Sequence, residues 1–337
     1  MLVGDVFDFD IYLRRIGLSR ASIRAHAQHS FSLMHAIAWG QATHIPFENL
    51  ATLYPSMRVV ALGDEPKDPV AALARQQRSQ LRNSLDPTDI YQKLVLSHRG
   101  GFCFEQNLLL ARALRETGLR VDLVAARGVN RGGDATSDGF ALSCFTHLVL
   151  ITVAHDGKRY LVDNGYGWAG APRQPLELVD GRVVEDPRTG EVFRLVRGDV
   201  SPSLAEGATL WGCHRFRVGH GGARKKSGAP DSRGWFLQYK SGAQAADYWD
   251  VYHFGVDGYV SAMDCESGAW YASTNPYHRQ TQIKLVALMT SDGRISLVDN
   301  ALTLRRAGKV ALEKAISNDE HELRGVMREY FDIEFVP

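Results

Sequence analysis

The segment Arg99-Gly100-Gly101-Phe102-Cys103-Phe104-Glu105-Gln106-Asn107 says most about how this chain folds. Two glycines precede the cysteine and an apolar run follows it, so the pattern predicts a helix that begins at or near Cys103. Unpartnered N–H groups and the positive end of the helix dipole favour the thiolate form of a cysteine there. The segment is therefore typical of a reactive sulfur, although a buried helical cysteine would produce the same pattern.

The composition is that of a globular protein without a strongly charged partner surface. The 337 residues carry a formal net charge of +1, and a chain of this length suits two or three domains. Nothing in this charge favours a nucleic acid or an acidic membrane as a partner. Asp5, Asp8 and Asp10 interrupt the apolar core that a signal peptide requires, and no apolar run is long enough to cross a bilayer.

The cysteines do not predict a metal site. Cys103, Cys144, Cys213 and Cys265 show no C-x-x-C pairing and no metal-ligand spacing with histidine. Without an export signal, four scattered cysteines fit free thiols in a reducing cytoplasm. We therefore expect no metal and a cytoplasmic location.

The order of predicted elements divides the chain into three parts of an α+β protein. Residues 1–119 read as a helical part that carries Cys103, with an insertion near residues 63–86. Residues 120–218 are rich in short strands, and residues 219–337 read as a linker followed by mixed strands and helices. We expect the strands to include residues 121–127, 147–153, 159–163, 216–218, 235–239 and 284–289, and a last helix over residues 319–330.

A nucleophilic cysteine needs a base, and the base needs a group that orients it. His147 heads one apolar strand and Asp163 ends the next, with an Asp-Gly turn signal between the strands. The turn lies at unequal distances from the two residues, so their pairing requires an offset or a bulge. The hairpin still predicts hydrogen-bond reach between them. A core histidine and a turn aspartate are the simpler alternatives.

These residues carry a resemblance that spans nearly the whole chain. The cysteine segment resembles the active-site signature of the arylamine N-acetyltransferases, and five further motifs are similar to that family's in the same order. They are Ile45-Pro46-Phe47-Glu48-Asn49-Leu50, Thr146-His147, Val162-Asp163-Asn164-Gly165-Tyr166-Gly167, Trp235-Phe236-Leu237-Gln238-Tyr239 and Ser273-Thr274-Asn275-Pro276.

The resemblance implies a helical bundle, a central β-barrel and a C-terminal α/β lid. It also implies a Cys-His-Asp triad of Cys103, His147 and Asp163, similar to that of cysteine proteases. The implied reaction is ping-pong acyl transfer from acetyl-CoA to an arylamine or hydrazine, with acetyl-CoA as a co-substrate rather than a bound cofactor. In that reaction His147 takes the thiol proton and Asp163 fixes its tautomer.

Other members of the motifs are interpreted as structural. We expect Glu48 and Arg99 to form an ion pair that holds the first helices against the cysteine segment. We expect Gln106 and Asn107 to bind loop backbone. Asn164 departs from the family pattern, in which a small apolar residue is more usual at that place.

The CoA contacts follow the family pattern less closely. The resemblance places Ser273 and Thr274 near CoA, and the basic cluster Arg224-Lys225-Lys226 is a candidate for contact with its phosphates, although a solvated surface loop is the simpler explanation of the cluster. Gln280 stands where the family often has an aromatic residue.

Three alternatives remain open. An amide synthase of the same superfamily would use the same triad but take its acyl group from a carrier protein. A binding protein that keeps the fold without catalysis would not need an intact cysteine, histidine and aspartate. A cysteine protease or transglutaminase shares the triad chemistry but not the motifs outside it.

Overall fold

The computed structural model describes residues 7–58, 83–130, 140–167, 169–198, 215–216, 234–242, 244–245, 247–317 and 319–336. The central part of the predicted insertion, Cys213 and the basic cluster at 224–226 lie outside these ranges. None of the helices in the described ranges combines the length and the apolarity that crossing a membrane would require.

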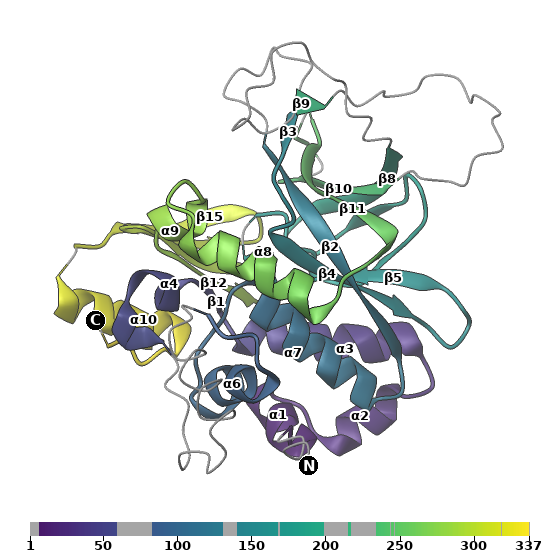
Figure 1. The fold of residues 1–337 in the computed structure, drawn as a ribbon, viewed down its shortest axis with the longest axis horizontal. Coiled ribbons are helices and arrows are strands. Elements are labelled where there is room, and N and C mark those ends of the chain that lie inside the picture. Colours follow the sequence, from purple (N-terminus) through teal and green to yellow (C-terminus); the bar gives the residue numbers. More distant parts are fainter. Residues whose placement is uncertain are drawn as a thin grey trace.

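Helices build the first part and share one apolar core. Figure 1 shows α1, α2, α3 and α7 side by side on one side of the large sheet. The core between them is made mainly by α3 and α7, which contribute Leu33, Ile37, Leu110 and Leu114. The helices are α1 (Phe9–Arg15), α2 (Arg20–His26), α3 (Ser30–His44), α4 (Leu50–Leu53), η1 (Pro55–Met57), α6 (Pro87–Tyr91), η2 (Gln92–Leu96) and α7 (Cys103–Glu116).

A ten-stranded sheet forms the second part and curls into a nearly closed barrel. Eight strands follow the path β6-β5-β4-β2-β11-β10-β8-β7, and β3 and β9 pair at its edge. Their bounds are β2 (Arg120–Asn130), β3 (Phe140–Leu142), β4 (His147–Val153), β5 (Arg159–Val162), β6 (Leu176–Glu177), β7 (Val183–Glu185), β8 (Val192–Gly198), β9 (Arg215–Phe216), β10 (Gly234–Lys240) and β11 (Trp249–Tyr259).

The sheet does not end at residue 218, where we expected the central part to end. Strand β10 pairs with β8, and β11 pairs with β2, so residues 234–259 complete the barrel. The reason is burial: Trp235, Leu237 and Tyr252 lie in the barrel core with Val149 of β4. A boundary taken from chain order alone missed this non-local pairing.

A five-stranded antiparallel sheet and three helices form the third part. The helices are α8 (Ala262–Thr274), α9 (Arg279–Gln282) and α10 (Glu320–Phe331). The strands are β12 (Leu285–Thr290), β13 (Gly293–Val298), β14 (Ala301–Arg306) and β15 (Lys309–Ala315), and the edge strand β1 (Phe47–Glu48) comes from the first part. Strand β1 thereby links this sheet to the rest of the molecule.

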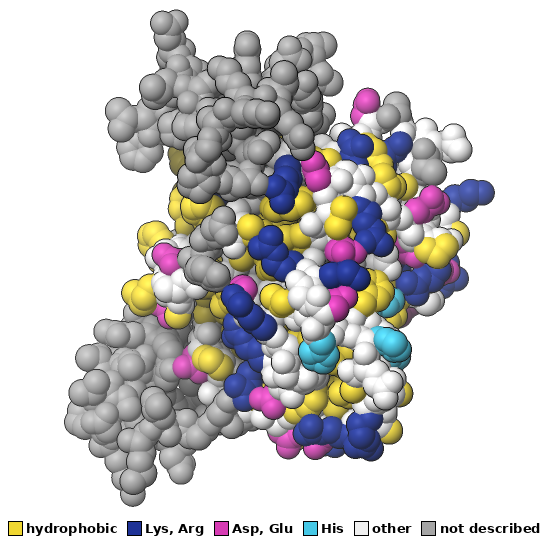
Figure 2. All heavy atoms as spheres, turned by 90° about the vertical axis from the view of Figure 1, so that its right-hand side faces the viewer, with side chains coloured by type: hydrophobic (Ala, Val, Ile, Leu, Met, Phe, Trp, Pro, Cys, Tyr) yellow, Lys and Arg dark blue, Asp and Glu magenta, His cyan; other side chains and the backbone are white. Residues whose placement is uncertain are grey.

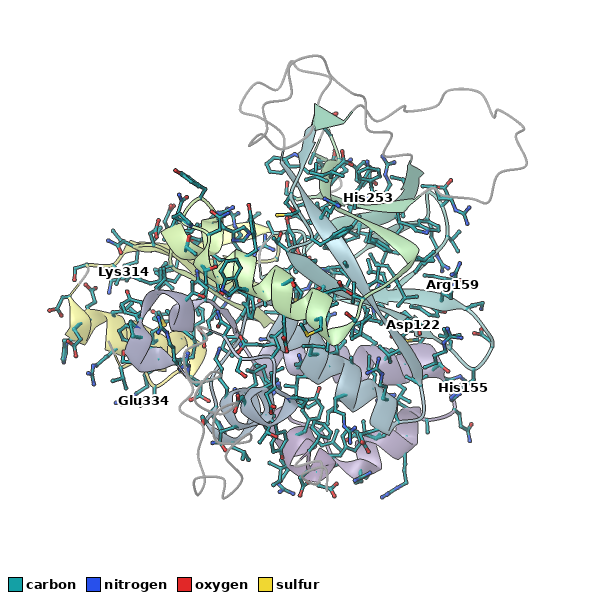
Figure 3. The ribbon with its side chains drawn as sticks, viewed as in Figure 1. Asp122, His155, Arg159, His253, Lys314 and Glu334 are labelled. Atoms are coloured by element: carbon teal, nitrogen blue, oxygen red, sulfur yellow. The ribbon has the colours of Figure 1, made fainter. Side chains whose placement is uncertain are left out.

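Figure 2 shows the charged side chains of the described residues on one face of the molecule. Basic and acidic side chains lie interspersed there, with apolar side chains between them. His155 marks the exposed turn between β4 and β5, and Arg159 begins β5 beyond it (Figure 3). The turn itself has the predicted Asp-Gly form, with Gly157 at a φ of 81°.

Candidate active site

Helix α7 begins at Cys103, as the cysteine segment predicts. The preceding glycines are required by close contacts rather than by unusual dihedral angles. A Cβ on Gly100 would lie 2.2 Å from the carbonyl oxygen of Pro46, and one on Gly101 would lie 2.9 Å from Glu105 Oε2. The Glu48 N–H also donates to the Gly101 carbonyl over 3.0 Å. The segment before Cys103 is therefore packed tightly against strand β1.

Four buried or nearly buried charges lie beneath this segment. Arg99 Nε donates to Glu48 Oε1 over 3.1 Å, which confirms the expected ion pair. Lys93, which the sequence did not single out, donates to both oxygens of Glu105 over 2.8 and 3.0 Å. Burial alone would raise the pKa of Glu48, but Arg99 and Lys93 hold it below its ordinary value. The network is charge-balanced, which is the condition for burying ions at acceptable cost.

Glu105 also caps helix α7, which begins at Cys103. Its Oε2 accepts the N–H of Phe102 over 3.0 Å. The N–H groups of Cys103 and Phe104 are the first two of α7, and no helical carbonyl lies one turn before them to accept their protons. N–H groups at a helix start are suited to stabilise negative charge that develops beside them.

His147 and Asp163 meet at the open end of the β4–β5 hairpin. Leu150 pairs with Val162 in this antiparallel ladder. Asp163 therefore falls two positions from His147 on the same face of the sheet. His147 Nε2 and Asp163 Oδ2 are 2.9 Å apart, and both side chains are buried. The predicted reach between them is confirmed, by an offset and without a bulge.

The electrostatics of this pair favour a charged histidine. Burial would lower the pKa of His147, but the Asp163 carboxylate and the neighbouring Cys103 sulfur outweigh it and raise the pKa to about 10. Burial would likewise raise the pKa of Asp163, and the contacts with His147, Asn107 and the Gly165 N–H hold it below its ordinary value. The two groups are thus a buried imidazolium–carboxylate pair at neutral pH.

Asn107 contacts the acid directly, which the sequence did not predict. Its Nδ2 donates to Asp163 Oδ1 over 2.8 Å as well as to the Leu148 carbonyl over 2.6 Å. The Gly165 N–H donates to the same Oδ1 over 2.8 Å. One carboxylate oxygen of Asp163 is therefore held by two donors and the other faces His147. Gln106 behaves as expected and donates to the Pro46 carbonyl over 2.7 Å.

The sulfur of Cys103 lies beside the histidine. Sγ contacts the Thr146 carbonyl oxygen at 3.5 Å, and Cys103 is near enough to His147 to contribute to its raised pKa. Because Nε2 of His147 binds Asp163, Nδ1 is the ring nitrogen left for the sulfur. The structure therefore brings Cys103, His147 and Asp163 together from α7, β4 and the end of β5.

Two tyrosines border the histidine, and no sequence motif pointed to one of them, Tyr252. The ring of Tyr252 on β11 lies 5.0 Å from that of His147, and the ring of Tyr166 lies 5.6 Å from it at a steep angle. Burial raises the pKa of Tyr166 to about 12. Tyr252 lies in β11, which pairs with β2, a strand far away in the sequence. The position of Tyr252 beside His147 therefore follows only from the fold.

Of the residues predicted to contact CoA, the structure describes Ser273 and Thr274, whereas Arg224-Lys225-Lys226 lie outside the described ranges. Ser273 and Thr274 form the last turn of α8, where Ser273 Oγ donates to the Ala269 carbonyl over 2.8 Å and Thr274 Oγ1 donates to the Trp270 carbonyl over 2.6 Å. Ser273 is buried. Gln280 offers its main-chain oxygen to Asn49 Nδ2 over 2.9 Å, so this segment is tied to the first part of the chain.

Other candidate ligands are accounted for within the described ranges. No group of three or more His, Cys, Asp or Glu side chains there is arranged to hold a metal ion. Cys144 is exposed, and Cys265 is buried in the cluster that also contains Cys103. Burial raises the pKa of Cys265 to about 11, which makes it a poor nucleophile. His253 lies on β11, where burial lowers its pKa to about 4 (Figure 3).

Comparison with known proteins identifies the family. A model of the N-acetyltransferase family matches residues 69–336. An arylamine N-acetyltransferase of Mycobacterium bovis is 31% identical over 227 residues, which is 67% of this chain and 65% of that relative. The chain belongs to the arylamine N-acetyltransferase family. This alignment spans just under two thirds of the length of the mycobacterial relative.

Two further comparisons extend the likeness over most of the chain. The N-malonyltransferase FDB2 of Gibberella moniliformis is 24% identical over 335 residues, covering 94% of this chain and 81% of the relative. The structure of the Mycobacterium marinum arylamine N-acetyltransferase in complex with CoA superposes with a TM-score of 0.67 at 23% identity. It covers 97% of this chain and 93% of that one, and at this identity it shows the shared fold.

Proposed function

We propose that this protein is an acyl-CoA-dependent arylamine N-acetyltransferase that works through an acyl-cysteine. The observation that carries the proposal is the buried His147–Asp163 pair beside a cysteine at the first residue of a helix. Membership of the family supports the same reaction. Acetyl-CoA is the proposed acyl donor and a small arylamine or hydrazine the acceptor.

The first half-reaction transfers the acyl group to the enzyme. His147 holds the proton of the Cys103 thiol on Nδ1, and the thiolate attacks the thioester carbonyl to form a carbon–sulfur bond. The negative charge moves to the carbonyl oxygen, near the first N–H groups of α7. As the intermediate collapses, the carbon–sulfur bond to CoA breaks and the CoA thiolate takes the proton from His147. Asp163 keeps His147 oriented throughout.

The second half-reaction returns the enzyme to its starting state. The amine nitrogen attacks the acyl-cysteine carbonyl and gives a proton to His147. The bond to Cys103 then breaks, which releases the amide and restores the thiolate–imidazolium pair. Aryl amines are weakly basic, so the acceptor nitrogen is unprotonated at neutral pH and needs no base before it attacks.

Steady-state kinetics test the proposal. With acetyl-CoA and an arylamine varied together, we expect parallel double-reciprocal lines, the pattern of a ping-pong reaction, and no turnover by Cys103→Ala. A Cys144→Ala variant serves as the matched control and is expected to keep its activity, since Cys144 is exposed and outside the triad. Turnover by Cys103→Ala would refute the proposed nucleophile.

The identity of the acyl group is a second question, raised by the malonyltransferase relative. Acetyl-, propionyl- and malonyl-CoA compared at equal concentration distinguish the donors. A carrier-bound acyl chain as the only accepted donor would instead support the amide synthase.

The basic cluster Arg224-Lys225-Lys226 remains a candidate for the CoA phosphates. Replacing all three residues with Ala should raise KM for acetyl-CoA and leave transfer from p-nitrophenyl acetate unchanged, because that ester has no phosphates. If the parent and the variant behave alike toward both donors, the cluster does not bind CoA and the contacts are to be sought around residues 273–280.

A further inference from the structure

The residue that follows Asp163 ties the acid's loop to a helix of the first part. Asn164 Nδ2 donates to the carbonyl oxygen of Ala38 in α3 over 2.8 Å, and its main-chain N–H donates to Asn107 Oδ1 over 3.0 Å. Asn107 in turn donates to Asp163 Oδ1 over 2.8 Å. A continuous chain of hydrogen bonds therefore runs from α3 to the carboxylate that faces His147.

A small cavity borders the loop on the α3 side. Ala38, Ala42, Asp163 and Asn164 are among the residues that line it. Arg173 also borders the cavity, but its guanidinium binds Asp186 over 2.6 Å and two main-chain carbonyl groups of the third part over 2.8 and 2.6 Å. Among the polar residues that border the cavity, Asn164 is thus the one that bonds the loop to α3.

On its other side the loop is pressed against the nucleophile. A Cβ on Gly165 would lie 2.7 Å from both the Cα and the carbonyl oxygen of Cys103. The loop therefore cannot move toward α7. Movement the other way, toward α3, would draw Asp163 away from His147, because Asp163 and Gly165 belong to the same turn.

We propose that Asn164 is a positioning residue that acts through Asn107 and Asp163 to keep His147 charged and oriented toward Cys103. The inference rests on the proposed function, in which the thiolate–imidazolium pair is the reactive state. It assigns a role to a residue at which this chain departs from the usual small apolar side chain. An apolar residue cannot donate to the Ala38 carbonyl, so in this chain the polar tie takes over the fixing of the loop.

The test compares Asn164→Leu with a matched control. Asn83→Leu removes one amide in the same way, since the buried Asn83 donates from Nδ2 to Thr52 Oγ1 over 2.8 Å, away from the triad. The readouts are the rate of iodoacetamide alkylation of Cys103 against pH, and kcat and KM for acetyl-CoA with an arylamine. Alkylation requires no acyl donor, so its rate reports on the Cys103–His147 pair even if the proposed function is wrong.

Asn164→Leu is expected to slow alkylation at pH 7 and to lower kcat by about three- to tenfold, the range of one hydrogen bond. It should shift the alkylation profile toward higher pH and leave KM for acetyl-CoA unchanged. Asn83→Leu should change kcat and alkylation by less than about twofold, even where its melting temperature falls equally. A lowered melting temperature of Asn164→Leu with an unchanged alkylation profile and unchanged kcat would overturn the proposal.

A second variant keeps the test decisive if leucine prevents folding. Asn164→Ala enlarges the cavity instead of filling it and also removes the donor. We expect Asn164→Ala to slow alkylation of Cys103 as much as Asn164→Leu does. Parent-like alkylation by a folded Asn164→Ala variant would equally refute a positioning role. Absence of acyl transfer by the parent would refute the proposed function, while the alkylation comparison would still decide the role of Asn164.

Discussion

The substitution Asp163→Asn removes the charge that keeps His147 protonated without changing the size of the side chain. The pKa of His147 is about 10, against an ordinary value of 6.5, and this gap corresponds to on the order of 5 kcal/mol in favour of the imidazolium. Burial alone lowers the pKa. Without the carboxylate only the Cys103 sulfur would oppose the effect of burial, so the pKa of His147 should fall and a smaller share of the molecules would carry a charged ring at pH 7.

The hydrogen bonds around position 163 make the loss larger. Asn107 Nδ2 and the Gly165 N–H both donate to Oδ1 of Asp163, so the introduced amide must turn its oxygen toward them. Its NH₂ group then points at Nε2 of His147 and forces the ring proton onto Nδ1. That nitrogen is the one that must receive the proton of Cys103. The variant therefore has the wrong tautomer as well as the wrong charge.

We expect the rate of acyl transfer to fall on the order of 10⁴-fold, as in serine-protease triads that lose their aspartate charge. The assay is transfer from p-nitrophenyl acetate to an arylamine, with alkylation of Cys103 at pH 7 measured in parallel. Asp186→Asn is the control, because Asp186 is a buried aspartate that pairs with Arg173 and not with His147. A loss of less than about tenfold, ~1.4 kcal/mol, would show that another group orients the histidine.

Three further predictions concern the surroundings of the site. Gly165→Ala would place a Cβ 2.7 Å from the main chain of Cys103, so it should lower the melting temperature and reduce activity at least about tenfold. Gly255→Ala is the control: it has open space around it and should leave activity unchanged. Lys93→Met should lower the free energy of unfolding in urea by about 3–5 kcal/mol, because it leaves Glu105 buried without its partner, and adding Glu105→Gln should restore part of the loss. Folding raises the pKa of His147 from 6.5 to about 10, so the stability that its charged form contributes is complete below about pH 6.5 and should be lost as the pH rises toward 10. Melting temperatures measured between pH 6 and 10 should therefore fall. A melting temperature that does not change over this range would contradict the raised pKa.

Local signals in the sequence were sufficient to predict that a helix begins at Cys103 and that His147 contacts Asp163. The two glycines followed by an apolar run fixed the start of α7 at Cys103. The Asp-Gly turn fixed the register of the β4–β5 hairpin, and with it the distance between His147 and Asp163. Each of these features depends on residues that are close together in the chain, which is why patterns of a few residues predict them.

The features that the sequence did not predict depend on contacts between segments that are distant in the chain. The pairing of β11 with β2 brings Tyr252 to His147 across more than a hundred residues, and no local pattern encodes that neighbour. The same holds for the limit of the barrel, which we placed at residue 218. Lys93 was missed because a lysine before a loop is usually solvated, and here only the packing of η2 against α7 buries it.

Asn107 shows how a correct interpretation of a residue type can be incomplete. The sequence predicted that its amide would bind loop backbone, and it does donate to the Leu148 carbonyl. Its second bond, to Asp163, depends on how the end of β5 meets the first turns of α7. The chemistry of an amide predicts how many bonds it makes, whereas the fold decides which groups receive them.

The most direct test of the account is the mass of the protein after incubation with acetyl-CoA alone. We expect one acetyl group per chain, mapped by peptide analysis to Cys103, and its loss when an arylamine is added. The Asp163→Asn variant should acquire the group far more slowly. An acetyl group on Cys144, Cys213 or Cys265, or an acetylated Cys103 that does not pass its group to any arylamine, would contradict the claim that this triad transfers acyl groups through Cys103.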